Sequence, residues 1–427
     1  MFLIQYKPRQ KYMRIYLFGM SICRVYFDSV FYRWFVKYVL SHRMKKKLKR
    51  INKHKKIRVG FLVSEQSKWG YASVYDAFAK SENYEPVILI TKLSLEHLGR
   101  KTYYKTGADC YTYFKNMGYN VELAYDEENH KYIPLNKLNI DIVFYQQPWE
   151  LDDSQHPINV SKYAITGYVS YGFELVADKI LYMDSFHRWL DFFFTPSQQT
   201  SDYLTSIAPD VSNIYISGYP KVDAYFDAIH KKLKKPVVIY APHHSFEKNS
   251  LNMATFQFNG REILHLAQST ADKIDWVFKP HPRFKHAVVI NNIMTQDEIE
   301  QYYNAWQKIG KIEEGGDYIN MFVNSSAMIT DCCSFLAEYL PSKHPVLHLI
   351  NPQGLYNDVA KSFINTYYQI YNTQELQNEF NRVIIRGDDY KKSERLSKVP
   401  IVFNKQQKSG ENIFNIIDKN IKTHHKH

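Results

Sequence analysis

From residue 57 onward, short apolar runs alternate with amphipathic stretches. Seven such runs fill the first part of this region, at 57–65, 84–91, 121–126, 140–148, 163–172, 191–197 and 213–220. Near-continuous apolar runs are typical of parallel strands buried on both faces, and helical stretches between them indicate βαβ units. The pattern predicts an α/β domain over residues 59–220.

A second series begins after the charged stretch 221–235, which we interpret as a linker. Its apolar runs lie at 236–246, 273–282, 321–334 and 344–350, again with helical stretches between them. This predicts a second α/β domain over 236–400, followed by a C-terminal helix and tail over 401–427. Two such units in series predict two doubly wound Rossmann-type domains that face each other across a cleft.

Residues 12–40 have a different pattern, rich in aromatic and aliphatic side chains but interrupted by charges. The longest uncharged stretch runs only from Ile15 to Cys23, which is too short for a helix that spans a bilayer. No small-residue cleavage site follows, so a secretory signal is not indicated. The segment, followed by the basic residues 42–58, predicts an interfacial helix on an anionic membrane surface. The alternative is a helix packed on the protein's own body.

The charge is concentrated in this N-terminal extension. Residues 1–58 hold 17 of the 55 Lys and Arg residues and one of the 43 acidic residues, although the whole chain has a net charge of +12. The rest is therefore slightly acidic, which argues against a nucleic-acid partner and favours a membrane-associating extension over 1–58. The four cysteines have no metal-ligand spacing, so we expect no metal site and a reducing compartment.

Polar clusters follow several of the predicted strands, where ligands of open α/β sheets bind. They are Ser64-Glu65, His243-His244, Lys279 to Arg283, and Asp331 to Ser334. Strand ends are polar by default, so the alternative is a set of ordinary loops.

These side chains suit a diphosphate. Lys279 and Arg283 would neutralise it, and His281 would donate to a phosphoryl oxygen. Ser334 lies at or just before a predicted helix start, where it serves as an N-cap, as a phosphate ligand, or as both. Because P-loop, dinucleotide and D-x-D motifs are absent, we expect no NTPase, dehydrogenase or metal-dependent sugar transferase, and no cofactor.

Four stretches together, "IYAPHHSF", "FKPHP", "SGYPKVDAYF" and "MITDCCSFLAEYL", resemble the ordered motifs of the CDP-glycerol glycerophosphotransferases, the teichoic acid polymerase and primase group. The resemblance implies a glycosyltransferase-B fold with an N-terminal acceptor domain and a C-terminal donor domain. It also implies a peripheral bacterial enzyme at the cytoplasmic face of the cell membrane. Such an enzyme moves an alditol phosphate from CDP-glycerol or CDP-ribitol to a lipid-linked or polymeric hydroxyl acceptor, in teichoic acid or capsule synthesis.

The resemblance also assigns residues. His281 matches the family's essential histidine, which contacts the donor diphosphate. The remaining matches, all on the donor side, are Asp331, Ser334, Glu338, Pro220 and Asp223, with His244 as a further donor contact. Three positions depart from the pattern: Lys221 replaces an arginine, Cys333 replaces a serine, and the loop at 166–174 lacks the histidine of the family's proposed base.

The implied reaction is in-line attack of an acceptor hydroxyl on the β-phosphorus of the donor, with CMP leaving. Positioning and charge stabilisation would supply most of the catalysis. Glu65, His243 and His244 are the candidates for the base, and each also has an ordinary structural role open to it. Two other functions stay open: a glycosyltransferase of the same fold that uses a nucleotide sugar, and a membrane-bound scaffold with a degenerate site.

Overall fold

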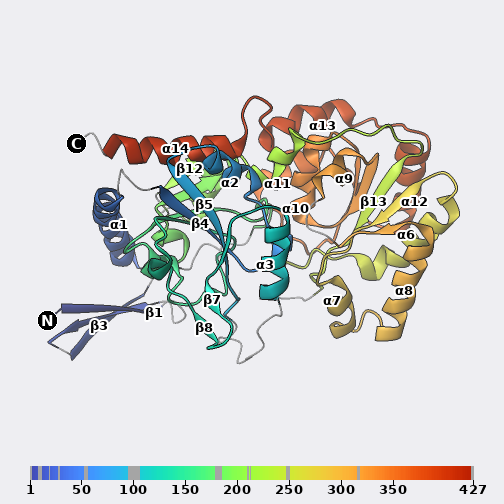
Figure 1. Cartoon of the computed structure of the whole chain (residues 1–427). Helices are drawn as coiled ribbons and strands as arrows, with labels where there is room; N and C mark the ends of the chain where they lie inside the picture. The colour runs from blue at the N-terminus through green and yellow to red at the C-terminus, as the bar shows by residue number, and fades with distance from the viewer. Residues whose placement is uncertain are drawn as a thin grey trace. The chain divides into compact units, whose positions relative to one another are not determined.

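The chain forms two compact units, which are described separately (Figure 1). The computed structural model describes residues 2–7, 12–18, 20–26, 29–51, 56–94, 106–177, 185–208, 211, 213–246, 251–314 and 318–424. Unit 1 consists of Met1–Tyr171, Lys179–Lys221 and Gln406–His427, and unit 2 consists of Gly172–Asp178 and Val222–Lys405.

Unit 1 contains a seven-stranded parallel sheet in the order β12-β11-β10-β9-β4-β5-β6. Its strands are β4 (Ile57–Val63), β5 (Tyr84–Ile90), β6 (Val121–Leu123), β9 (Ile142–Tyr145), β10 (Ile165–Val169), β11 (Phe192–Thr195) and β12 (Ile214–Ile216). In chain order, the first strand lies beside the fourth at the centre, and later strands extend to either side. This is the doubly wound topology expected from the apolar runs.

The other elements of unit 1 are helices and a small hairpin. They are η2 (Gln66–Lys68), α2 (Ala72–Ala79), α3 (Thr106–Asn116), β7 (Tyr125–Asp126), β8 (Lys131–Tyr132), η4 (Leu135–Leu138), α4 (Pro157–Val160), η6 (His187–Trp189), α5 (Gln198–Ile207) and α14 (Ser409–His424). The C-terminal helix α14 returns from unit 2 and lies along α2 (Figure 1). Gly410 makes this approach possible, because a Cβ there would come within 2.3 Å of the Ser73 backbone.

The N-terminal extension is a three-stranded antiparallel sheet followed by one long helix. The strands are β1 (Phe2–Lys7), β2 (Tyr12–Leu17) and β3 (Met20–Tyr26), and the helix is α1 (Val30–Arg50). The predicted helix over 12–40 is therefore wrong for 12–26, where β-branched and aromatic residues pair across strands. It is confirmed from Val30 onward. Residues 52–55 of the basic segment lie outside the described residues.

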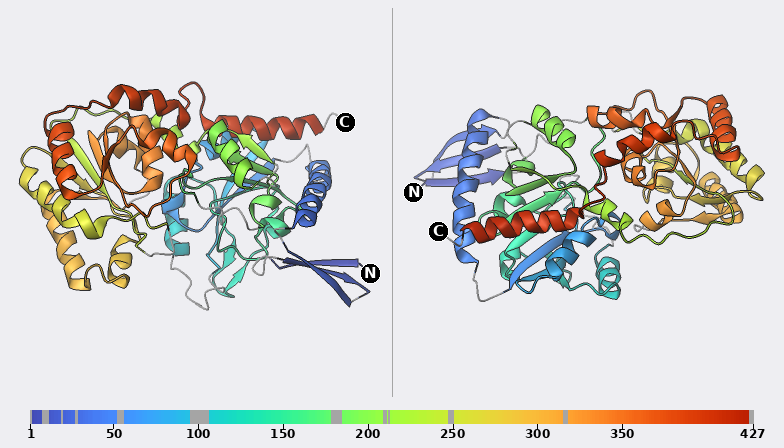
Figure 2. Two further views of the ribbon diagram at one scale, coloured as in Figure 1. Left: turned by 180° about the vertical axis from the view of Figure 1, so that it is seen from behind. Right: turned by 90° about the horizontal axis from the view of Figure 1, so that it is seen from above.

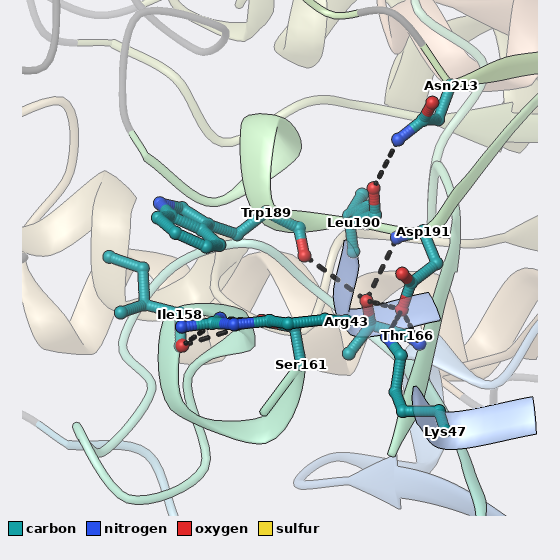
Figure 3. A network of polar contacts seen from close by, with 9 residues as sticks. All are labelled: Arg43, Lys47, Ile158, Ser161, Thr166, Trp189, Leu190, Asp191 and Asn213. Atoms are coloured by element: carbon teal, nitrogen blue, oxygen red, sulfur yellow. Dashed lines mark hydrogen bonds and ion pairs between the residues drawn. The ribbon is translucent and has the colours of Figure 1, made fainter. Parts of the chain in front are cut away.

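One face of α1 is anchored to unit 1 by a polar network (Figure 3). The Lys47 ammonium lies 2.5 Å from the Asp191 carboxylate, and both side chains are buried. Asp191 also accepts hydrogen bonds from the backbone and hydroxyl of Thr166. The Arg43 guanidinium donates to Ser161 Oγ at 2.7 Å and lies 4.8 Å from the centre of the Trp189 ring. Burial lowers the pKa of Lys47, although Asp191 opposes that shift.

Apolar contacts complete this anchor. Tyr32, Val36 and Leu40 of α1 pack with Ile158 and Trp189, and both views in Figure 2 place α1 beside the small N-terminal sheet. The first two turns of the helix are positioned by Ser29, whose hydroxyl accepts from Tyr32 N at 3.2 Å. This face of α1 is part of the fold of unit 1.

Unit 2 contains a six-stranded parallel sheet in the order β15-β14-β13-β16-β17-β18. Its strands are β13 (Val237–Ala241), β14 (Asp275–Phe278), β15 (Lys311–Ile312), β16 (Ala327–Thr330), β17 (Val346–Leu349) and β18 (Tyr368–Ile370). In chain order this is 3-2-1-4-5-6, the Rossmann order. The predicted doubly wound topology is confirmed in both units.

The sheet of unit 2 is covered by helices and has an aromatic core. The helices are η7 (Pro220–Tyr225), α6 (Phe256–Thr270), α7 (Phe284–Ile290), α8 (Gln296–Ile309), α9 (Ile319–Val323), α10 (Cys333–Glu338), η8 (Leu340–Ser342), α11 (Asp358–Ile364), α12 (Thr373–Glu379), η9 (Phe380–Ile385), α13 (Lys392–Lys398) and η10 (Val399–Ile401). Phe278 stacks on Trp306 at 5.0 Å, and Tyr240 stacks on both within 5.9 Å. These rings fix β13 and β14 against α8.

In the part of the chain that the structure describes, no helix is both long enough and apolar enough to cross a bilayer.

Candidate functional site

The centre of the unit 2 sheet, between β13 and β16, is a topological switch point, because strand order reverses there. Asp331 is the first residue after β16 and is completely buried. One carboxylate oxygen accepts from the backbone N–H of His243 at 2.6 Å, and the other accepts from the backbone and hydroxyl of Thr255 at 2.6 and 2.8 Å. Asp331 therefore fixes the loop after β13 and the start of α6.

The environment of Asp331 opposes its ionisation. Burial raises the pKa of this carboxyl to about 6, and the hydrogen bonds from His243 and Thr255 oppose that rise. At neutral pH Asp331 is still ionised and accepts three hydrogen bonds, which is consistent with a role in fixing backbone.

Three histidines from two strand ends lie against one another. The rings of His244 and His281 stack with centroids 3.8 Å apart and planes 17° apart. The His243 ring lies 4.6 Å from His244 and 5.9 Å from His281. The structure thus brings together the strand ends "APHHS" and "KPHPR".

Hydrogen bonds define the tautomer of His243. Its Nδ1 accepts from the Ser245 backbone N–H at 3.3 Å and lies 2.7 Å from the Ser245 hydroxyl. Nδ1 therefore carries the lone pair, and Nε2 carries the proton of the neutral ring. Burial, assisted by the neighbouring His244, lowers the pKa of His243 to about 3. This ring is neutral at physiological pH and is a hydrogen-bond donor through Nε2.

His281 is held in the same way. Its Nδ1 accepts from the backbone N–H of Arg283, two residues further on, at 3.1 Å. The same reasoning places the proton of the neutral ring on Nε2. His281 is half-buried, and its role as a donor to a phosphoryl oxygen stays a prediction. The Arg283 side chain is exposed beside it.

Lys279 is buried, and its ammonium faces protein groups. Its Nζ donates to the Glu313 carbonyl at 3.4 Å and lies 5.1 Å from the centre of the Tyr318 ring. The Tyr318 hydroxyl in turn donates to the carboxylate of Glu338, which is completely buried. Lys279 and Glu338, both predicted from sequence, are thus connected by a tyrosine that the sequence did not indicate.

Ser334 does not cap its helix, and this corrects one reading of the sequence. Helix α10 begins at Cys333, its N-cap is Cys332, and Ser334 is the second helical residue. The helix has six residues, so its dipole is short. Ser334 Oγ lies 3.6 Å from Cys332 Sγ. Its hydroxyl remains at the end of β16, where the alternative role of a phosphate ligand is not affected.

The predicted residue Glu65 belongs to unit 1, at the corresponding edge of the other sheet. Gln146, the first residue after β9, accepts from the backbone N–H groups of Ser64 and Glu65, both at 3.1 Å, and donates to the Glu65 carbonyl at 2.7 Å. The Glu65 carboxylate pairs with Lys68 at 2.8 Å.

Pro220 and Asp223 lie on η7, the short helix where the chain passes from unit 1 to unit 2. The Pro220 carbonyl accepts from Ser73 Oγ at 3.4 Å, and Asp223 is buried. Their predicted contact with a donor stays a prediction.

Four residues of these two edges carried no clear signal in the sequence: Thr255, Tyr318, Gln146 and Lys68. Ser245 could have been found from the sequence, because it lies only two residues after His243 in the same loop. Among the described residues, no group of three or more His, Cys, Asp or Glu side chains is arranged to hold a metal ion.

Several solved structures share this fold. A UDP-N-acetylglucosamine 2-epimerase of Listeria monocytogenes, described as putative, has a TM-score of 0.59 at 13% identity, with 86% of this chain and 97% of that chain covered. The S. aureus MnaA-UDP co-structure gives 0.56 at 14% identity, with 86% and 97% covered. The UDP-GlcNAc 2-epimerase of Neisseria meningitidis, bound to UDP-GlcNAc, gives 0.54 at 14% identity, with 86% and 100% covered.

These similarities show the fold, which is glycosyltransferase-B-like with two Rossmann-type units. No sequence among the curated proteins matches the chain. A family model does match it, over residues 176–419, which is more than half of the chain and includes every strand of the unit 2 sheet. That model describes CDP-Glycerol:Poly(glycerophosphate) glycerophosphotransferase. The chain therefore belongs to this family of transferases.

Proposed function

We propose that this protein transfers an alditol phosphate, glycerol phosphate or ribitol phosphate, from a CDP-linked donor to a hydroxyl acceptor, and releases CMP. The acceptor is a lipid-linked or polymeric chain, and the setting is teichoic acid or capsule synthesis at the cytoplasmic face of a bacterial cell membrane. Membership of the glycerophosphotransferase family supports this proposal.

The observation that carries it is the histidine cluster at the switch point of unit 2. His243 and His281 each have Nδ1 bonded to a backbone N–H and therefore present Nε2–H as a donor. Such donors suit the oxygens of a diphosphate, and the exposed Arg283 adds a positive charge beside them. Lys279 adds a second positive charge at the same strand end.

In the proposed step, the acceptor oxygen attacks the β-phosphorus of the donor. The new P–O bond forms as the bond from that phosphorus to the CMP oxygen breaks, and CMP leaves. The acceptor proton passes to a base, and then to solvent. His281 and Ser334 would hydrogen-bond the phosphoryl oxygens, whose negative charge is stabilised by fixed donors more effectively than by mobile water.

Of the three candidates for the base, His243 is the weakest, and Glu65 and His244 stay candidates. The lone pair of His243 is already used by Ser245, and its pKa of about 3 makes it a poor proton acceptor at neutral pH. The Glu65 carboxylate is partly exposed, with 20% of its side-chain surface accessible, and Gln146 holds its backbone in place.

The nucleotide is tested by thermal stabilisation of the full chain. CDP-glycerol or CDP-ribitol is expected to raise Tm, and UDP-GlcNAc is expected to leave it unchanged, since the proposal is specific for a cytidine donor. Stabilisation by UDP-GlcNAc alone would support the alternative, a glycosyltransferase that uses a nucleotide sugar. Stabilisation by neither nucleotide would favour a scaffold without a working site.

The cluster is tested by His281→Ala. We expect CMP release from CDP-glycerol to fall by about 1,000-fold or more, because a donor to the phosphoryl oxygens is lost. Circular dichroism and Tm are expected to remain close to those of the parent. His286→Ala is the matched control, because His286 is exposed on the helix that follows and lies five residues away. Full activity of His281→Ala would contradict the assignment.

We further propose that α1 contacts an anionic membrane surface with the face opposite to its anchor. Phe31, Trp34 and Tyr38 are 55, 64 and 62% exposed, and the spacing of three to four residues places them on one side of the helix. Lys45, Lys46 and Lys49 are exposed on the following turns. Aromatic rings with adjacent basic residues are the composition of an interfacial helix.

Deletion of residues 1–58 would be a poor test, because it would also remove Lys47 from the buried Asp191. The triple change Phe31→Ser, Trp34→Ser, Tyr38→Ser leaves the anchored face intact. It is expected to reduce sedimentation with vesicles containing phosphatidylglycerol by about 10-fold or more. Unchanged sedimentation, with the fold preserved, would rule out this surface.

A further inference from the structure

The carboxyl edge of the unit 1 sheet carries a second group of side chains whose role is not assigned by the family motifs above. They follow three adjacent strands: Glu65 and Lys68 come after β4, Gln147 and Trp149 after β9, and Tyr171 after β10. The centre of this edge, between β4 and β9, is the switch point of the sheet, where strand order reverses.

The backbone beneath these side chains is fixed. Gln146 is 2% exposed and bonds both the N–H and the carbonyl of Glu65. The buried hydroxyl of Tyr71 joins the ends of β9 and β10, since it donates to the Tyr145 carbonyl at 2.7 Å and accepts from Val169 N at 2.9 Å. The groups above are therefore carried on a rigid platform, as a preorganised binding site requires.

Lys68 occupies the middle of the group. Its Nζ lies 2.8 Å from both Glu65 Oε1 and Gln147 Oε1. Gln147 is itself oriented, because its Nε2 donates to the Trp149 carbonyl at 3.1 Å. The Lys68 and Glu65 side chains keep 15 and 20% of their surface accessible. A ligand can therefore reach a cation and a carboxylate within one small area, while Gln147, 2% exposed, holds Lys68 from beneath.

Two aromatic rings form a corner beside Lys68. The rings of Trp149 and Tyr171 meet nearly at a right angle, 85°, with centroids 5.2 Å apart. The Lys68 ammonium lies 5.9 Å from the first centroid and 6.0 Å from the second. Tyr171 is 37% exposed, and its carbonyl accepts from the Tyr219 hydroxyl at 3.1 Å.

We propose that the corner formed by Lys68, Gln147, Trp149 and Tyr171 binds the polyhydroxyl end of the acceptor, a neutral sugar or alditol residue. The C–H face of such a residue packs on the rings, and its hydroxyls exchange hydrogen bonds with Lys68 and Glu65, which Gln147 helps to position. An aromatic surface with a few convergent polar groups is the usual composition of a small-molecule site. This inference rests on the proposed function, since it supplies the acceptor for that reaction.

The charges favour a neutral ligand over a phosphate. The Lys68 ammonium is already paired with the Glu65 carboxylate, so the two together contribute no net charge. A phosphate brought to Lys68 would also approach that carboxylate, and like charges repel. A hydroxyl meets no such cost, and it can also donate a hydrogen bond to the same carboxylate.

The test measures binding without turnover, by isothermal titration of the full chain with a glucose hexamer and, separately, with a glycerol phosphate hexamer. Both hexamers carry polyhydroxyl residues. Comparing the two titrations distinguishes binding of a neutral glycan from binding of a phosphate-linked polymer. We expect Trp149→Ala and Lys68→Met each to weaken binding by about 10-fold, while the Kd for CDP-glycerol stays within about 2-fold of the parent value.

Trp34→Ala is the matched control, because Trp34 also belongs to unit 1 and also lies against a tyrosine, Tyr38, at 5.8 Å. It is expected to leave hexamer binding unchanged. Tyr171→Ala changes a partly exposed ring and is the second variant if Trp149→Ala does not fold.

Binding of neither hexamer by the parent, or equal losses in Trp34→Ala and in the corner variants, would overturn the proposal. A different result would contradict the proposed function and leave this inference standing. In that case the parent would bind a hexamer through Trp149 but would not bind CDP-glycerol.

Discussion

Gln146 and Asp331 occupy the same position in two sheets, yet one is a neutral amide and the other a carboxylate. Each is the first residue after the fourth strand of its sheet, at the switch point, and each is buried. Each fixes the backbone that follows the first strand of the sheet. Because the two positions are equivalent in the fold, the difference between an amide and a carboxylate must come from the groups around each side chain.

The choice follows from the groups that each side chain meets. Asp331 faces donors only, namely two backbone N–H groups and one hydroxyl. Gln146 faces two backbone N–H groups and also the carbonyl of Glu65, to which it must donate. A carboxylate accepts but cannot donate, whereas an amide does both. One edge thus acquires a buried negative charge, and the other remains neutral beside the Glu65–Lys68 pair.

The largest effect is expected where a buried carboxylate loses its cation. Lys47→Met leaves the buried carboxyl group of Asp191 without its cation, and we expect the free energy of unfolding to fall by about 4 kcal/mol. Urea denaturation at pH 7.5 measures it. Lys46→Met, at an exposed neighbouring position, should change stability by less than about 0.5 kcal/mol. A small effect of Lys47→Met would mean that Asp191 is readily solvated.

A somewhat smaller effect is expected for Asp331→Asn. The amide NH₂ of the new side chain would face N–H or O–H donors of Thr255 or His243, so at least one hydrogen bond is replaced by a repulsive contact. We expect a loss of about 3 kcal/mol at pH 7.5, measured by the same urea method. Asp358→Asn is the control, since the Asp358 side chain is 88% exposed. If Asp331→Asn were as stable as the parent, the unit 2 sheet would not require a carboxylate at this position.

The reciprocal change, Gln146→Glu, sharpens the comparison. An ionised carboxylate there would face the Glu65 carbonyl, and we expect a cost of about 2 kcal/mol at pH 7.5. A protonated carboxyl regains a donor, so its pKa in the folded state would lie above the unfolded value. The variant is then expected to recover stability relative to the parent as pH falls from 7.5 to 5. A cost independent of pH would contradict this account.

The smallest effect per pH unit, up to about 1.4 kcal/mol for each group, concerns acid stability, which we expect unit 2 to lose through its buried histidines. Burial lowers the pKa of His243 and of His348 to about 3. The unfolded chain therefore binds more protons below about pH 6.5, and stability falls as pH decreases from that value. Asp331 acts in the opposite sense, because its raised pKa of about 6 adds stability as pH falls toward its unfolded value.

His348→Gln tests the histidine contribution. Between pH 6.5 and 5, each buried histidine makes the free energy of unfolding fall by up to about 1.4 kcal/mol for each pH unit. In the variant, the contribution of one histidine is removed, so its stability should depend less steeply on pH. Urea midpoints at pH 7, 6 and 5 measure it, and His265→Gln, exposed on α6, is expected to keep the parent slope. An identical slope in His348→Gln would show that this histidine is protonated without cost.

The predictions that hold are those in which the signal lies within one short segment. An apolar run with a polar end identifies a buried parallel strand and the residues at its carboxyl edge, because both are consecutive in the chain. His243, His244, Lys279 and His281 were found in this way, and the motifs around them identified the family. The doubly wound topology followed from the alternation of strands and helices.

The tertiary structure decided what depends on a partner distant in sequence. Residues 12–17 and 20–26 form strands because they pair with each other in a sheet, and a helical interpretation of the same aromatic residues does not include that contact. The stacking of His244 on His281, the link from Lys279 through Tyr318 to Glu338, and the amide of Gln146 bonding Glu65 all join residues from different strands or helices. The sequence by itself determined which groups stand at each strand end, and only the fold determined which of them meet, because side-chain contacts across a sheet are set by strand order.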